Sequence, residues 1–98
     1  MTCGVYAIIN IIDGSRYVGS SNNLEYRAEQ HFHRLELRTH HNYKLQKAYD
    51  LSPDGFAFVI LETPWLEEIR LREQIWINRL GKYKPLYNIR LEVEMTNE

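Results

Sequence analysis

Near the N-terminus, two short runs rich in β-branched and aromatic residues flank the dipeptide Asp13-Gly14. Residues 4–12 read GVYAIINII and residues 16–20 read RYVGS, and both compositions are typical of strands. Asp-Gly favours the tight turn that joins two strands in a hairpin. We therefore predict an antiparallel pair at the start of the chain, and every later element has to pack against it.

The rest of the sequence predicts three helices and one more strand. Capping side chains precede the first two helices, in the segments SNN (residues 21–23) and THHN (39–42). Thr63 and Pro64 favour the start of the last helix, and Gly81 favours its end. The predicted helices span residues 24–38, 42–51 and 64–80, the third strand spans 56–62, and residues 83–89 form a turn with a short extended piece. The order β-β-α-α-β-α indicates an α+β domain with a small, mostly antiparallel sheet packed on helices.

The length of 98 residues allows one domain, which we place at residues 1–90, with 91–98 as a polar tail or the start of a linker. No run approaches the roughly 20 apolar residues of a membrane span, and the N-terminus does not resemble a signal peptide. The single cysteine, Cys3, excludes an internal disulfide and fits a reducing compartment. We expect a protein of the cytoplasm, without a membrane partner.

The formal net charge of −1 argues mildly against a nucleic-acid partner, because most DNA-binding domains are basic overall. A polyanion could still bind if the basic residues were concentrated on one side. The helical patterns address this second possibility.

Glu73 falls in the middle of the apolar face of the last predicted helix. That face is formed at helical spacing by Leu66, Ile69, Trp76, Ile77 and Leu80. A carboxylate in such a place is destabilising unless it is paired, protonated or bound to a metal ion. Glu73 is therefore either one half of a structural salt bridge or a metal ligand or acid/base group.

The first predicted helix carries basic residues along one edge of its apolar face. Arg27, His31, Arg34 and Arg38 follow at spacings of four, three and four, and His40, His41, Lys44 and Lys47 could extend the stripe. Solvated arginines on a surface are the ordinary explanation. Segregated positive charge beside a core edge also suits a groove that holds phosphates, so we predict DNA contacts at Arg34, Arg38, Lys44 and Lys47.

Tyr6 and Tyr17 would lie on adjacent strands of the predicted hairpin. Most strand tyrosines are packing residues, but a phenol near an arginine and a metal ion can position or activate water. The four histidines show no convincing zinc spacing. His31, one turn from Arg27, is the histidine best placed for chemistry, with a structural role as the alternative.

Two tripeptides now connect these residues to a known family. Gly4-Val5-Tyr6, ten intervening residues, and Tyr17-Val18-Gly19 resemble the signature of the GIY-YIG nucleases, with valine for isoleucine in each. The later positions match in order and spacing: Arg27, His31, His40, Glu73 and Asn88. The resemblance covers residues 4–89 and is greatest to the N-terminal catalytic domain of phage intron-encoded homing endonucleases. It implies a phage-infected or bacterial host cell.

The resemblance implies a three-stranded antiparallel sheet flanked by helices and hydrolysis of DNA with one divalent ion, Mg²⁺ or Mn²⁺. It implies that Glu73 binds this metal and that Arg27 holds the scissile phosphate. Tyr6 and Tyr17 would position or deprotonate the attacking water, and which tyrosine has which role is left open. His31 would relay a proton. The supporting residues would be His40, Asn88 and the structural Gly19.

Such nucleases usually carry a separate DNA-recognition domain, for which this sequence has no room. We expect a catalytic domain, free-standing or part of a longer chain, that is targeted by another domain or a partner protein. The alternative is a non-catalytic nucleic-acid- or protein-binding module on the same fold. Occupancy of every expected catalytic position argues against that alternative.

Overall fold

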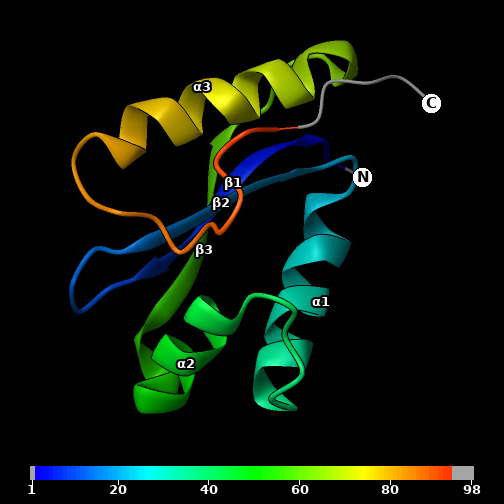
Figure 1. Cartoon of the computed structure of the whole chain (residues 1–98). Helices are drawn as coiled ribbons and strands as arrows, with labels where there is room; N and C mark the ends of the chain where they lie inside the picture. Colours follow the sequence, from blue (N-terminus) through cyan, green and yellow to red (C-terminus); the bar gives the residue numbers. More distant parts are fainter. Residues whose placement is uncertain (1, 94–98) are drawn as a thin grey trace.

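The computed structural model describes residues 2–93, and its elements are drawn in Figure 1. Their bounds are β1 (Gly4–Asn10), β2 (Arg16–Ser21), α1 (Leu24–Glu36), α2 (Tyr43–Leu51), η1 (Pro53–Gly55), β3 (Phe56–Glu62), η2 (Leu66–Glu68) and α3 (Ile69–Gly81). The order β-β-α-α-β-α and the three-stranded antiparallel sheet confirm the predicted α+β fold. No helix within residues 2–93 combines the length and hydrophobicity needed to cross a bilayer.

The strand β1 lies at the centre of the sheet, in the order β2-β1-β3, and is antiparallel to both neighbours. Gly14 turns the hairpin with a φ of 80°, a value that glycine adopts readily. The first strand is shorter than predicted, because the turn already begins at Asn10. The Asn10 N–H donates to the Ser15 carbonyl at 2.8 Å, and the Asn10 carbonyl accepts from the Gly14 N–H at 2.7 Å. The apolar residues Ile11 and Ile12, which suggested a longer strand, lie exposed in this turn.

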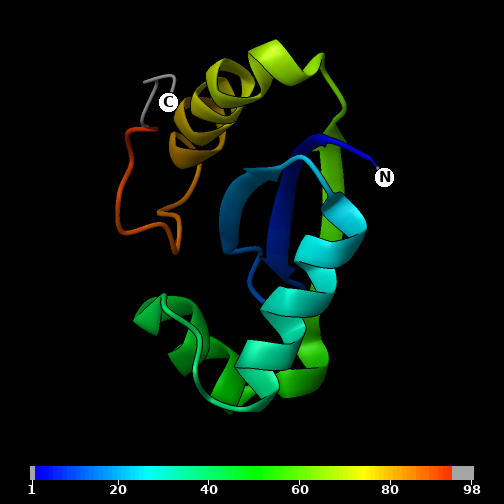
Figure 2. The ribbon, with the colours of Figure 1, turned by 90° about the vertical axis from the view of Figure 1, so that its right-hand side faces the viewer.

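Side chains alternate along β1 and supply two hydrophobic clusters, one on each face of the sheet. Under α1 and α2 the buried members are Tyr6, Ile8, Leu24, Leu35 and Leu45, and under α3 they are Val5, Val18, Ile77 and Leu86. Figures 1 and 2 show α3 on one side of the sheet and α1 and α2 on the other. The central strand therefore holds the two helical layers in place from both sides.

The last helix begins later than predicted. Residue 63 precedes a proline, which disfavours helical backbone there, and Trp65 is extended with φ −61° and ψ 147°. The chain then makes the short turn η2 before α3 starts at Ile69. Thr63 is consequently no helix cap, and Leu66, predicted on the apolar face, is 59% exposed.

The segment after α3 returns across β2 toward α3 (Figure 1). It was expected to be partly extended, and it forms no strand within residues 82–93. Its hydrogen bonds still extend the sheet edge: the Tyr87 N–H donates to the Arg16 carbonyl at 2.8 Å, and the Asn88 amide bonds both the N–H and the carbonyl of Val18 at 2.8 Å. Residues 91–93 of the predicted tail are attached to α3, where Gln74 bonds the Leu91 carbonyl and the Val93 N–H. Residues 94–98 lie outside the described residues.

The importance of the central strand can be tested with two isoleucines. Ile8 is 0% exposed, whereas Ile12 is 72% exposed. We predict that Ile8→Ala lowers the free energy of unfolding by about 2–5 kcal/mol, because it removes buried methyl groups and leaves a cavity. Ile12→Ala should change it by less than about 0.5 kcal/mol. Urea unfolding of both variants measures this, and similar losses for the two would contradict the assigned packing.

Candidate active site

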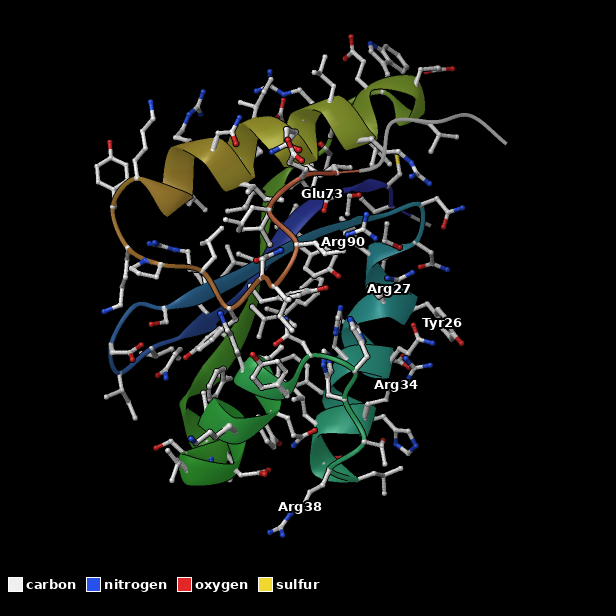
Figure 3. All side chains as sticks on the ribbon, viewed as in Figure 1. Tyr26, Arg27, Arg34, Arg38, Glu73 and Arg90 are labelled. Atoms are coloured by element: carbon white, nitrogen blue, oxygen red, sulfur yellow. The ribbon has the colours of Figure 1, made fainter. Side chains whose placement is uncertain are left out.

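A cleft of about 910 Å³ opens at the β2 edge of the sheet, where the two helical layers and the C-terminal segment meet. Among the residues that line it are Tyr17, Ser20, Arg27, His41, Glu73 and Arg90. In Figure 3, Arg27, Glu73 and Arg90 come from α1, α3 and the C-terminal segment, around this region. Cationic, acidic and phenolic groups from distant parts of the sequence therefore share one cavity.

Glu73 faces β2 from the middle of α3, as the helical pattern predicted. The Ser20 hydroxyl donates to its Oε1 atom at 2.5 Å. Burial raises the pKa of Glu73, although the Ser20 hydrogen bond and the charges of Arg70 and Arg27 oppose the shift. Elsewhere on α3, Arg72 forms an ion pair with Glu62 at 2.8 Å. The hydrogen-bonding partner of Glu73 is thus a neutral hydroxyl, which leaves the carboxylate suited to a cation.

Arg27 lines the cleft from the first half of α1. Its Nε atom is buried and has no hydrogen-bond partner among residues 2–93. A buried donor without an acceptor destabilises a fold by about 1–3 kcal/mol. Such a donor at the wall of an open cleft is well suited to an anionic acceptor that binds there.

The two signature tyrosines occupy different depths. Tyr17 is half-buried and lines the cleft, whereas Tyr6 is 1% exposed and lies behind it. The Tyr6 hydroxyl lies 2.6 Å from the Nε2 atom of His31. Burial raises the pKa of both phenols, so both are protonated at neutral pH in the free protein. Gly19 pairs with Tyr6 across the hairpin, and a Cβ at this position would lie 2.5 Å from the Tyr6 hydroxyl, which explains why glycine is needed there.

The predicted cationic stripe on the first helix is not formed. His31 is buried, and burial, followed by nearby positive charges, lowers its pKa to about 3, so it is neutral. The helix ends at Glu36 and not near residue 38, and Arg38 lies beyond it with a φ of 61°. Helical spacing could not reveal the position of Arg38, because α1 ends before this fourth residue of the predicted stripe.

The other predicted positions lie around the cleft. Asn88 lines it and holds β2, whereas His40 is buried beneath it with its pKa lowered by burial to about 4. The predicted DNA contacts are exposed and outside the cleft lining: Arg34, Arg38, Lys44 and Lys47. Figure 3 shows Arg34 further along α1 than Arg27, and Arg38 beyond the end of that helix. Their proposed contacts with DNA stay predictions.

The polar cleft residues that sequence reasoning missed include Ser20 and Arg90, whereas His41 was named only as a possible extension of the basic stripe. Ser20 could have been found, because it lies two residues after the buried Val18 on β2 and so shares the face toward α3. Arg90 follows irregular backbone, for which no periodicity predicts a direction.

The chain belongs to the GIY-YIG family: the model of the GIY-YIG catalytic domain matches residues 2–88. This confirms the predicted family and places the chain in the endonuclease class, whose GIY-YIG members generally depend on a divalent metal ion. Among curated relatives, it is 35% identical over 91 residues to Intron-associated endonuclease 1 of Enterobacteria phage T4. The match covers 91% of this chain and 37% of that protein.

Two solved structures share the fold. One is the catalytic domain of homing endonuclease I-TevI, with a TM-score of 0.82 and 34% identity, covering 91% of this chain and 99% of that one. The other is a mutant of the same catalytic domain, with a TM-score of 0.82 and 35% identity, covering 92% and 95% of the two chains. These matches extend the predicted likeness to homing-endonuclease catalytic domains from sequence to structure.

The neutral buried histidines predict a pH dependence of stability. Histidine in the unfolded chain titrates near pH ~6.5, whereas burial lowers the pKa of His31 to about 3 and of His40 to about 4. Below about pH 6.5 the unfolded chain therefore binds more protons, and the free energy of unfolding falls as the pH drops from about 6.5 toward 4. Each histidine contributes at most about 1.4 kcal/mol per pH unit, and the full stability is present above pH ~6.5.

Urea unfolding between pH 7.5 and 5 measures this dependence. His31→Gln should reduce the slope of the unfolding free energy against pH, whereas His33→Gln, at an exposed position of α1, serves as the control and should keep it. A His31→Gln variant with the native slope would show that His31 is not buried in its neutral form.

Proposed function

We propose that this protein is an endodeoxyribonuclease that hydrolyses DNA phosphodiester bonds in the cleft, with a divalent metal ion. The observation that carries the proposal is the pairing of Arg27 and Glu73 across one cavity, each with unused bonding capacity toward a ligand. Within the described residues 2–93, Arg27 has a buried Nε donor without an acceptor, and Glu73 accepts a hydrogen bond from a neutral hydroxyl. Membership of the GIY-YIG family supports the same reaction.

Glu73 is suited to hold the metal ion. Residues 2–93 contain no group of three or more acidic, histidine or cysteine side chains that could enclose an ion. Mg²⁺ is commonly held by one or two carboxylates together with waters and substrate phosphates, and Mn²⁺ shares this preference for oxygen ligands. A single carboxylate at a roomy, polar cleft therefore fits an ion that the DNA phosphate helps to bind. Such an ion would supply Lewis-acid activation of the phosphate and lower the pKa of a bound water.

Arg27 would bind the scissile phosphate through its free Nε donor. In hydrolysis, a water oxygen forms a bond to phosphorus and loses a proton, while the bond from phosphorus to the 3′ oxygen breaks and that oxygen gains a proton. Negative charge increases on the phosphate oxygens along this path. A fixed guanidinium stabilises that charge more than it stabilises the substrate.

Tyr17 would orient the attacking water, because it is the signature tyrosine that reaches the cleft. Its raised pKa keeps it protonated in the free protein, so it acts first as a hydrogen-bonding group and becomes a base only if bound cations lower that pKa. Tyr6 would act from behind the cleft, near Arg27. Asn88 would support the site by holding β2 beside α3.

Target choice would come from outside this domain. The chain covers 37% of the length of the phage T4 relative, and its net charge of −1 favours weak DNA affinity of its own. A separate DNA-recognition domain or a partner protein would then supply specificity. Arg34, Arg38, Lys44 and Lys47 would contact phosphates that flank the cleavage site.

Nicking of supercoiled plasmid tests the proposal. With Mg²⁺ or Mn²⁺ the native protein should nick DNA, and a chelator should abolish nicking. Glu73→Gln and Arg27→Ala should each reduce the rate by about 10²- to 10³-fold, the usual effect of removing one group that stabilises transition-state charge. Glu29→Gln, at an exposed carboxylate on the same protein, is the matched control and should keep the native rate.

Two outcomes would contradict the proposal. Nicking that survives Glu73→Gln or Arg27→Ala would mean that the cleft is not the site of cleavage. A folded native protein that binds DNA but nicks no substrate with either metal would instead favour the binding-module alternative.

A further inference from the structure

A chain of three hydrogen bonds runs from the start of α2 to Tyr6, behind the cleft. The backbone N–H of Asn42 donates to His40 Nδ1 at 3.0 Å. His40 Nε2 lies 2.8 Å from His31 Nδ1, and His31 Nε2 lies 2.6 Å from the Tyr6 hydroxyl. All four residues are buried, so water does not compete for these bonds.

The first donor determines the direction of the whole chain. A backbone N–H can only donate, so His40 Nδ1 must accept and carries no proton. A neutral imidazole has one N–H, which in His40 must then be Nε2–H, and this group donates to His31 Nδ1. By the same reasoning the single N–H of His31 is at Nε2, and it donates to the Tyr6 oxygen.

This reasoning requires that both histidines are neutral and that Asn42 cannot turn away. Burial and nearby positive charges lower the pKa of His31 to about 3 and that of His40 to about 4, so each ring carries one proton at neutral pH. Asn42 is fixed as the cap of α2, since its side-chain oxygen accepts from the Leu45 N–H at 3.0 Å. Its amide nitrogen also donates to the Tyr87 carbonyl at 3.0 Å.

We infer that the backbone N–H of Asn42 fixes the direction of this hydrogen-bond chain. Each group donates to the next, from Asn42 through His40 and His31 to the oxygen of the Tyr6 hydroxyl. His31 and His40 are then positioning residues for Tyr6, and His31 does not accept the Tyr6 proton. A reversed chain would point the N–H of His40 Nδ1 at the N–H of Asn42 and leave both buried donors without an acceptor. The link to catalysis rests on the proposed function, whereas the direction of the chain does not.

The direction has a consequence for Tyr6. One lone pair of its oxygen is occupied by His31 Nε2–H, so the phenol proton has to point away from His31. Arg27 also interacts with this phenol and, like His31 Nε2–H, can only donate to it. Since neither His31 Nε2–H nor Arg27 can accept it, the hydroxyl proton points away from both groups. Tyr6 is thereby held as a hydrogen-bond donor of fixed direction behind the cleft.

NMR of the histidine rings tests the inference directly. Long-range ¹H–¹⁵N spectra of the ¹⁵N-labelled native protein at pH 7 distinguish Nε2–H from Nδ1–H tautomers. We expect both His31 and His40 as Nε2–H. Finding His31 as Nδ1–H, or as a mixture of the two forms, would overturn the inference.

Two substitutions at His40 separate positioning from packing. His40→Gln keeps a side-chain N–H that can donate to His31 Nδ1, whereas His40→Leu removes the donor. His31 should stay Nε2–H in the Gln variant and become a tautomer mixture in the Leu variant. Nicking should fall about 10- to 100-fold with Leu, the usual loss when a partner that orients a histidine is removed, and much less with Gln. An unchanged His31 tautomer in a folded Leu variant would overturn the inference.

The two proposals can fail separately. Native Nε2–H tautomers in a protein that never nicks DNA would support the chain and reject the nuclease. Nicking by a native protein with His31 as Nδ1–H would support the nuclease and reject the chain.

Discussion

The rest of the structure depends on the burial of β1 between two layers of helices. Val5 and Tyr6 are neighbours in sequence but belong to clusters on opposite faces of the sheet. This alternation fixes α3 on one face and α1 on the other, while β2 remains an edge strand beside both. At that edge residues of both layers meet, and there the cleft contains Arg27 from α1 and Glu73 from α3. The site is therefore a consequence of how the sheet is covered.

The polar groups of the site are held at some expense of stability, which is a common property of functional sites. In the part of the chain that the structure describes, Arg27 has a buried donor without an acceptor, and burial raises the pKa of the Glu73 carboxyl group. Behind them, the Asn42 N–H and all four ring nitrogens of His40 and His31 have hydrogen-bond partners in the Tyr6–His31–His40–Asn42 chain. Polar groups behind the cleft are hydrogen-bonded, whereas groups at the cleft wall have unused bonding capacity. This contrast indicates that a ligand is expected in the cleft.

Much of the fold and part of the candidate site could be predicted from the sequence, and the predictions that were wrong have physical reasons. Strand composition and the Asp13-Gly14 turn were sufficient for the hairpin, and the helical wheel placed Glu73 correctly on the inner face of α3. Pro64 disfavours helical backbone at the residue before it, so α3 begins later than the pattern of apolar residues predicts. Helical spacing placed His31 in the basic stripe, with a structural role as the alternative, because spacing shows which face a residue occupies but not how deeply it is buried. Arg90 reaches the cleft through tertiary packing of irregular backbone, so no local signal pointed to it.

The central claim is that one cleft at the β2 edge binds and cuts DNA between Arg27 and Glu73. The most direct measurement is a crystal structure of the Glu73→Gln variant with a short DNA duplex, since this substitution keeps the shape of the side chain while preventing cleavage. We expect a phosphate oxygen within hydrogen-bonding distance of Arg27 Nε, between α1 and α3. DNA bound to another face, with Arg27 Nε still lacking an acceptor, would contradict it.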